Sequence, residues 1–199
     1  MVLTYANQLT ILRVIFIPFI VINLIYGHPK TATLIFILAA ITDGLDGLLA
    51  RTFQQKTVLG SYLDPIADKL LLTSVFITLT VPSLPVPVHI PIWLTALTIT
   101  RDVLIALIAL IIHLRTGHSR FPPSFLGKCT TAVQLLTVGI CMFSSFYSEL
   151  GTNVFPWVVL TALLFTVASG MHYFYRTMKL LGSYNGMEGK DGAKRTQNN

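Results

Sequence analysis

Acidic side chains are concentrated in apolar parts of a chain that is otherwise poor in charge. The 199-residue sequence has eight Asp and Glu residues. An ionised carboxylate near the centre of a bilayer costs roughly 2.5–3.5 kcal/mol, so such a group faces a polar cavity, pairs with a cation or binds a metal. Five of the eight nevertheless lie within or at the ends of strongly apolar segments, and this distribution indicates a functional site: Asp43, Asp46, Asp64, Asp68 and Asp102.

The first four of these carboxylates have helical spacing. Positions 43, 46, 47, 50 and 51 share one face of a helix, and positions 60, 64 and 68 recur every four residues on a second helix. Two antiparallel helices joined by a short connection can bring the four carboxylates together. Their hard oxygen ligands suit Mg²⁺, Mn²⁺ or Ca²⁺ better than zinc. We therefore predict a divalent-cation site.

Small residues and one arginine share the faces of these carboxylates. Gly47, Ala50 and Gly60 leave room for a flat or bulky polar group to approach the backbone, and Arg51 adds a positive charge. The alternative is that the small residues only let membrane helices pack closely.

The composition indicates that these carboxylates lie in a membrane protein. Hydrophobic residues make up 53% of the chain and charged residues 11%, whereas soluble domains have roughly 25% charged residues. This excludes a water-soluble fold, a disordered chain and a collagen. Cys129 and Cys141 lie 12 residues apart in one apolar segment, which separates them by about 18 Å along a helix, too far for a disulfide.

Six apolar blocks are long enough to cross a bilayer. The sequence predicts an all-α polytopic bundle in which residues 1–181 form the membrane domain and residues 182–199 a polar, mobile tail. The first block lacks the basic start of a cleavable signal peptide, so we interpret it as a retained span. The predicted spans are residues 8–26, 32–52, 60–81, 92–115, 126–148 and 153–178.

Basic residues predict the orientation of the bundle. With the N- and C-termini in the cytoplasm, the opposite loops hold only Lys30. The site then opens to the cytoplasmic side, in a bacterial inner membrane. The formal charge of +6 reflects this topology and affinity for an anionic leaflet or substrate, not for nucleic acid. The cytoplasmic ends and loops hold Arg51, Lys56, Arg115, Arg120, Lys128, Arg176, Lys179, Lys190, Lys194 and Arg195.

The acidic pattern resembles a known signature. Asp43-x2-Asp46-Gly47-x2-Ala50-Arg51-x8-Gly60-x3-Asp64-x3-Asp68 matches, without a substitution, that of the CDP-alcohol phosphatidyltransferases. In that family the hydroxyl of a second alcohol displaces CMP from a CDP-linked lipid such as CDP-diacylglycerol. Six spans and a length near 200 residues are also similar to bacterial members, and the resemblance implies a homodimer.

The resemblance also implies roles for the matching residues. Two divalent cations, Mg²⁺ or Mn²⁺, are expected on Asp43, Asp46 and Asp64. Asp68 is expected to complete the cluster and to act as the base that takes the proton of the acceptor hydroxyl. The CDP pocket is expected to be lined by Asp43, Gly47, Ala50, Arg51, Gly60 and Asp64.

Three cations are candidates for binding an acceptor phosphate: Arg101, Lys128 and Arg13. Arginine offers phosphate a planar fork and lysine a compact charge. Other roles are open: Arg101 pairs with Asp102 or Asp68, Arg13 extends to the interface, or Lys128 anchors the helix end. Lys69 points about 100° away from Asp68 on an ideal helix, so we expect its amine near the surface.

The resemblance favours two acceptors that carry a glycerol phosphate and leaves inositol, serine and choline acceptors open. The opening from Asn7 to Arg13 and the string from Lys128 to Gln134 are similar to the branch whose acceptor is glycerol 3-phosphate. That branch usually carries Arg-Glu where this chain has Arg101-Asp102, and Arg-Asp resembles the cardiolipin-forming branch, whose acceptor is phosphatidylglycerol. We expect glycerol 3-phosphate, with phosphatidylglycerol as the alternative.

Two other classes of protein also place carboxylates in a membrane. A cation transporter would show repeated halves or helices broken at matching positions, and the sequence shows neither. A non-catalytic assembly factor does not explain four aligned carboxylates.

Overall fold

A computed structural model describes residues 5–52, 58–116 and 125–197. Side chains at several places in these ranges, including residues 43–52, 58–62 and 179–197, lie outside the description. No strand occurs in the described ranges, which confirms the all-helical prediction. The helices are α1 (Tyr5–Ile25), α2 (Pro29–Thr52), α3 (Val58–Thr78), α4 (Ile92–Thr116), α5 (Phe125–Phe143) and α6 (Ser148–Gln197).

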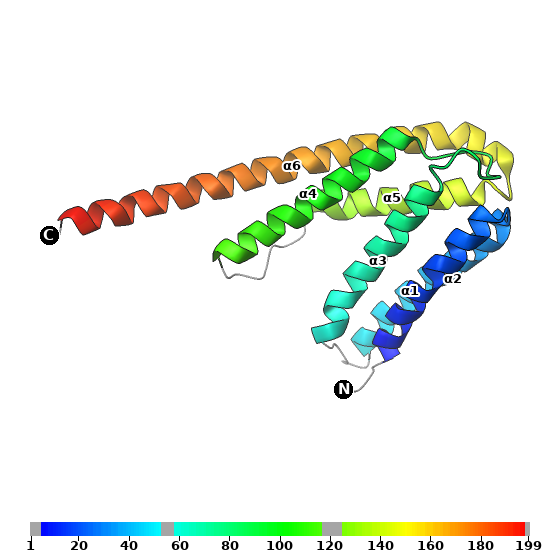
Figure 1. Cartoon of the computed structure of the whole chain (residues 1–199), viewed down its shortest axis with the longest axis horizontal. Helices are drawn as coiled ribbons and strands as arrows, with labels where there is room; N and C mark the ends of the chain where they lie inside the picture. The colour runs from blue at the N-terminus through cyan, green and yellow to red at the C-terminus, as the bar shows by residue number, and fades with distance from the viewer. Residues whose placement is uncertain (1–4, 53–57, 117–124, 198–199) are drawn as a thin grey trace.

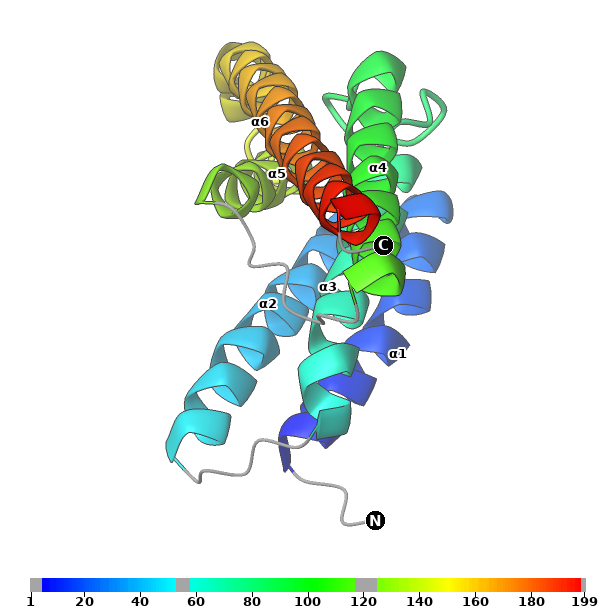
Figure 2. The same ribbon diagram turned by 90° about the vertical axis from the view of Figure 1, so that its left-hand side faces the viewer.

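The helices form two groups of three (Figure 1). In the first group α1 packs against both α2 and α3, and in the second α6 packs against α4 and α5. Helices α3 and α5 join the two groups, since α5 contacts both α2 and α3. Figure 2 shows the start of α1, the end of α2 and the start of α3 at the same end of the first group.

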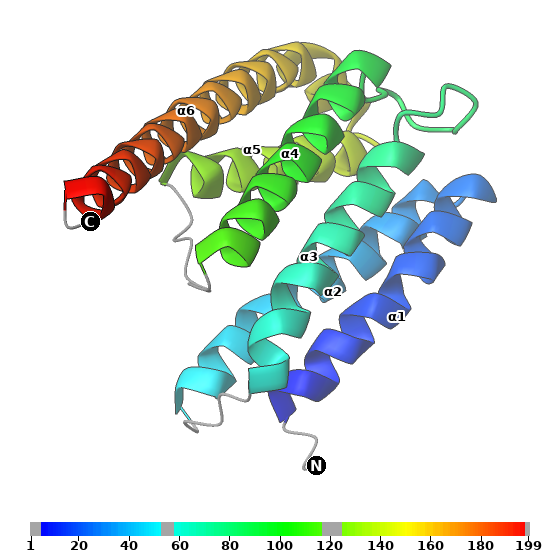
Figure 3. The same ribbon diagram turned by 60° about the vertical axis from the view of Figure 1, so that its left-hand side comes forward.

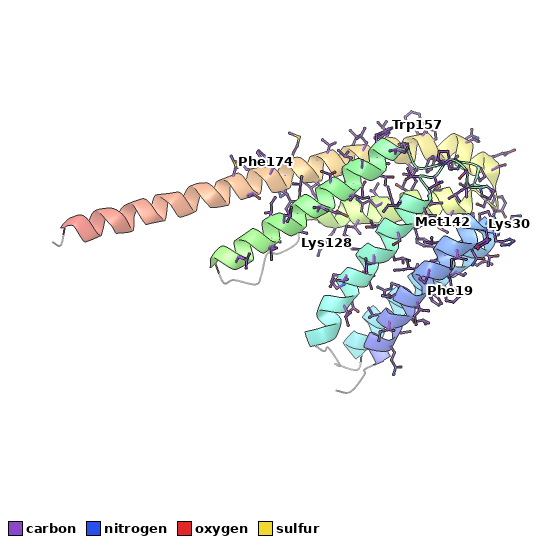
Figure 4. The ribbon with its side chains drawn as sticks, viewed as in Figure 1. Phe19, Lys30, Lys128, Met142, Trp157 and Phe174 are labelled. Atoms are coloured by element: carbon purple, nitrogen blue, oxygen red, sulfur yellow. The ribbon has the colours of Figure 1, made fainter. Side chains whose placement is uncertain are left out.

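The bundle has a mainly apolar core that also contains polar side chains, and its outer surface carries large apolar side chains. Its core contains Ile20, Leu24 and Phe76, yet Arg13 and Gln134 are also fully buried. Large apolar side chains such as Phe19 and Phe174 are more than half exposed, and Figure 4 shows them pointing away from the helices. A surface of this kind is stable against lipid tails. Because lipid tails are as apolar as these side chains, membrane helices associate through polar contacts and close packing of small residues.

Four helices in the described part of the chain are long and apolar enough to cross a membrane. Together with the composition they support an integral membrane protein. Helix α2 contributes a shorter apolar segment, Pro29–Thr42, which ends where the acidic signature begins. The count of six spans and the orientation of the termini stay predictions. The four candidate spans are Gln8–Ile25, Ile92–Leu110, Phe125–Phe143 and Gly151–Tyr175.

A glycine cap joins α1 tightly to α2. Gly27 has a φ of 82°, a conformation that costs a residue with a Cβ roughly 1–2 kcal/mol. The amide of His28 donates to the carbonyl of Asn23 (2.8 Å), and the amide of Gly27 donates to that of Leu24 (3.3 Å). This pair of bonds ends α1 by satisfying its last carbonyls.

Helix α6 is the longest element and extends beyond the other helices toward the C-terminus (Figure 3). It continues as helix to Gln197, through most of the segment 182–199 that the sequence predicts to be a tail. The domain boundary near residue 181 and the mobility of the tail stay predictions.

Candidate functional site

Two carboxylates of the signature are held by helix α1. The Thr10 hydroxyl donates to Oδ1 of Asp64, and the Arg13 guanidinium donates to Oδ1 of Asp68. Thr10 and Arg13 lie three residues apart, and Asp64 and Asp68 lie four apart, so each pair occupies one face of its helix. The two contacts therefore form on successive turns of helices that run in the same direction.

Arg13 is buried completely. Its partner Asp68 has a side chain that is 47% exposed, so the ion pair has one buried and one accessible member. The alternative in which Arg13 extends to the interface is wrong, because the side chain is fully buried. It lies between α1 and α3, where it forms an ion pair with Asp68. The Asp68 side chain therefore stays about half exposed while it is paired with Arg13.

A second ion-pair cluster connects α3 to α4. The Lys69 ammonium lies 2.6 Å from Oδ2 of Asp102, and a guanidinium nitrogen of Arg101 lies 2.6 Å from Oδ1 of the same carboxylate. Of the two alternative partners for Arg101, Asp102 is the one that it contacts. Lys69 is half-exposed, as expected for its stem, but its amine has a specific acidic partner on the next helix.

Arg101 is also held by α6. Its second guanidinium nitrogen donates to the Ser169 hydroxyl, and its Cζ lies 5.8 Å from the centroid of the Tyr173 ring, within the range of a cation–π interaction. Arg101 is only 7% exposed, and its Nε has no hydrogen-bond partner in the described part of the chain. The side chain is therefore fixed but retains a donor.

These cations share one cavity with Lys128. The cavity has a volume of about 530 Å³, and Arg13 is not among its described lining residues. Figure 4 shows Lys128 at the start of α5, at the opposite end of the bundle from Lys30. The structure thus brings together Arg101 and Lys128, two of the three predicted phosphate ligands. The polar and charged lining consists of Lys69, Thr73, Arg101, Asp102, Lys128, Thr131 and Tyr173.

The remaining predicted residues are placed by backbone alone. Asp43, Asp46, Gly47, Ala50 and Arg51 belong to the second half of α2, and Gly60 belongs to the first turn of α3. Their side chains lie outside the described residues. The four-carboxylate cation site and the CDP pocket therefore stay predictions.

The sequence assigned no catalytic, metal or phosphate-binding role to three contributors: Thr10, Lys69 and Asp102. Thr10 lies three residues before Arg13, a spacing that indicates a shared helix face. Asp102 is the fifth carboxylate in an apolar segment, and its cost in lipid already indicated a cationic partner. No sequence signal identified Lys69 as that partner, because the contact joins two helices.

The fold and the site together define an integral membrane helical protein whose cations and carboxylates pair between helices. A sequence model described as CDP-alcohol phosphatidyltransferase matches residues 3–168. The chain therefore belongs to the CDP-alcohol phosphatidyltransferase family. This membership confirms the resemblance of the signature, identifies an enzyme of the phosphatidyltransferase class and disfavours the cation transporter.

Three relatives show the range within the family. A "Probable phosphatidylglycerophosphate synthase" of Mycobacterium tuberculosis is 35% identical over 89% of this chain and 83% of its own length. A CDP-diacylglycerol--glycerol-3-phosphate 3-phosphatidyltransferase of Haemophilus influenzae is 32% identical over 83% of this chain and 88% of its own. A cardiolipin synthase (CMP-forming) of Rattus norvegicus is 30% identical over 86% of this chain and 60% of its own.

Proposed function

We propose that the protein transfers the phosphatidyl group of CDP-diacylglycerol to the hydroxyl of glycerol 3-phosphate, giving phosphatidylglycerol phosphate and CMP. One observation carries the choice of a phosphate-bearing acceptor. Lys69, Arg101 and Lys128 line a single cavity, and Lys69 directly follows Asp68 in α3. A phosphate bound by these cations keeps the acceptor near the proposed base.

The donor side of the reaction needs neutralisation of a pyrophosphate. Asp64 and Asp68 offer hard oxygen ligands and are oriented by Thr10 and Arg13, which fits a site for Mg²⁺ or Mn²⁺. Two such cations, when bound, would supply Lewis-acid stabilisation of the attacking and leaving oxygens. The proposed ligands are Asp43, Asp46, Asp64 and Asp68, and the proposed CDP-pocket residues are Asp43, Gly47, Ala50, Arg51, Gly60 and Asp64.

The residues of the chain then perform alignment and proton transfer. Asp68 takes the proton of the acceptor hydroxyl, for which its half-exposed side chain is accessible. Arg13 fixes the orientation of that carboxylate through their ion pair. Arg101 and Lys128 bind the acceptor phosphate. Such phosphoryl chemistry depends mainly on positioning and electrostatic stabilisation.

We further propose that the protein works as a homodimer in a bacterial inner membrane, with the site open to the cytoplasm. The basic residues of the loops support this orientation. The acyl chains of the donor then remain in the bilayer while the CDP head group enters from the cytoplasm.

Phosphatidylglycerol is the second candidate acceptor, which would make the protein a cardiolipin synthase. The Arg101-Asp102 pair supports this candidate, as does a relative named cardiolipin synthase (CMP-forming). The cavity also has apolar lining residues such as Val103 and Ile105, which suit a lipid acceptor. Both acceptors carry a glycerol phosphate, so the same cations serve either one.

An assay of the purified protein in detergent tests the proposal. CDP-diacylglycerol is supplied with Mg²⁺ or Mn²⁺ and with either acceptor, and CMP and the lipid product are measured. We expect CMP release that requires glycerol 3-phosphate and yields phosphatidylglycerol phosphate. Release that requires phosphatidylglycerol instead would transfer the assignment to cardiolipin synthesis.

The variant Asp68→Asn tests the proposed base in the same assay. The amide keeps the shape of the side chain but cannot take a proton, so we expect turnover to be abolished while CDP-diacylglycerol binding remains. Glu149→Gln, at the exposed start of α6, is the control for loss of one carboxylate. Full activity of purified Asp68→Asn would contradict the assignment of the base.

A further inference from the structure

We infer that Asp102 is a positioning residue that holds Lys69 and Arg101 at the cavity, and that affinity for the acceptor phosphate depends on this contact. The inference rests on the proposed function, because it concerns the same cavity. It adds a carboxylate to the cations proposed to bind the acceptor phosphate.

The geometry shows one carboxylate shared by two cations from different helices. Oδ2 of Asp102 lies 2.6 Å from the Lys69 ammonium of α3, and Oδ1 lies 2.6 Å from a guanidinium nitrogen of Arg101 on its own helix. All three residues line the same cavity. The Asp102 side chain is 18% exposed and that of Arg101 is 8% exposed, so water and salt screen this pair less than surface charges. The Lys69 side chain is 41% exposed.

Electrostatics explains why the carboxylate is needed. Two like charges that contact the same carboxylate repel each other, and the carboxylate between them offsets that repulsion. The three described cations of the cavity and this carboxylate leave a net charge of +2 (three minus one). That charge matches a doubly ionised phosphate monoester, the group that glycerol 3-phosphate carries.

The two cations depend on Asp102 to different degrees. Arg101 is also held by the Ser169 hydroxyl and the Tyr173 ring. Lys69 has a flexible stem and a side chain that is 41% exposed, so without Asp102 its amine is free to turn toward the surface. The loss of Asp102 therefore acts mainly through Lys69.

The position of Lys69 connects this effect to the reaction. Lys69 follows Asp68 directly in α3, so the contact with Asp102 fixes the base-bearing helix against the helix that carries Arg101. Asp102 thereby affects both the net charge of the cavity and the position of Arg101 relative to Asp68, the proposed base. The expected consequence is on acceptor binding rather than on donor binding.

Inorganic phosphate is a probe of the cavity that requires no turnover. A ligand that binds the folded state raises Tm, and the rise grows with the logarithm of the ligand concentration relative to Kd. We therefore measure the rise in Tm across a phosphate titration for purified protein in detergent. We expect a rise for the wild type, its loss in Asp102→Asn with a fall in phosphate affinity of about tenfold or more, and its recovery in Asp102→Glu. Glu149→Gln is the matched control and should respond like the wild type.

Kinetics provides the second readout. In Asp102→Asn we expect KM for the acceptor that is active in the wild type to rise about tenfold or more, while KM for CDP-diacylglycerol changes less than twofold. A purely structural role would lower Tm and affect both substrates equally. Where Asp102→Asn does not fold, Lys69→Gln removes the cation that Asp102 holds and should cause a loss of phosphate affinity of at least the same size.

Two results would overturn the inference. One is an equal phosphate response in the wild type and in Asp102→Asn or Lys69→Gln, and the other is no response in the wild type. The proposed function is judged separately, by whether the wild type forms phosphatidylglycerol phosphate from glycerol 3-phosphate.

Discussion

Single polar side chains of α1 organise the acidic face of α3. Thr10 is buried and donates to Asp64, so a hydroxyl that carries no charge orients one of the proposed metal ligands. Arg13 does the same for Asp68 with a full charge. In an apolar bundle these donors matter, because a carboxylate without a partner is costly there.

The variant Thr10→Val tests the orientation of Asp64. Valine keeps the shape of threonine but removes the hydroxyl, and a hydrogen bond to a charged group contributes about 1.5–3 kcal/mol. We expect the Mg²⁺ concentration for half-maximal activity to rise by about tenfold or more, measured as CMP release across a Mg²⁺ titration.

The control for this variant is Thr137→Val. Thr137 is equally buried, but its hydroxyl donates to the carbonyl of Val133 in its own helix (2.8 Å). An unchanged Mg²⁺ dependence in Thr10→Val would show that the hydroxyl does not orient a metal ligand.

At the scale of elements, close turns bring the helices into register. The Gly27 cap reverses the chain between α1 and α2. A second close approach occurs where α6 begins, because a Cβ at Gly151 would lie 2.6 Å from Cβ of Ser144 and 3.3 Å from Cγ1 of Val88. The α5–α6 hairpin thus requires a residue without a side chain at this position.

The variant Gly151→Ala tests this requirement. The added methyl group must displace backbone-attached atoms, and overpacking of this kind costs about 1–3 kcal/mol. We expect Tm in detergent to fall by roughly 2–12 °C, using the scale known for domains of this size.

Gly139→Ala is the matched control in α5, since a Cβ there would have no neighbouring atom within 4 Å in the described part of the chain. Alanine also favours a helix interior over glycine by roughly 1 kcal/mol, so Tm should stay unchanged or rise. A fall in Gly139→Ala as large as in Gly151→Ala would mean that packing at Gly151 is not the cause.

At the scale of the whole molecule, the sequence predicts that the bundle has a basic end and an end with little charge. Lys128 and Lys30 lie at opposite ends (Figure 4), and the bias of basic residues toward the end with Lys128 predicts that this end is cytoplasmic. The acceptor cavity, which Lys128 lines, would then open toward the compartment that supplies glycerol 3-phosphate and receives CMP.

Single-cysteine labelling tests this orientation. Cysteines at Lys30 and at Phe125, which are both exposed, are introduced into a Cys129→Ser, Cys141→Ser background. We expect a membrane-impermeant maleimide to label Lys30→Cys in intact cells and Phe125→Cys after permeabilisation. The reverse pattern would place the cavity on the outer side.

The sequence by itself determined the all-helical class, the family and the helices that carry the signature. Hydropathy and fixed residue spacing are local properties, and a helix converts them directly into apolar spans and shared faces. The sequence also proposed Arg101 and Lys128 as ligands of one phosphate, because few basic residues lie within apolar segments or at their ends.

Only the tertiary structure decided which charges pair. The sequence groups Arg13 with the acceptor cations, and the packing of α1 on α3 adds its ion pair with Asp68; its role in binding phosphate stays a prediction. The sequence predicts the amine of Lys69 near the surface, and the approach of α4 adds Asp102 as its partner. Such contacts depend on the rotation and register of helices that are distant in sequence, and no local spacing encodes those two quantities.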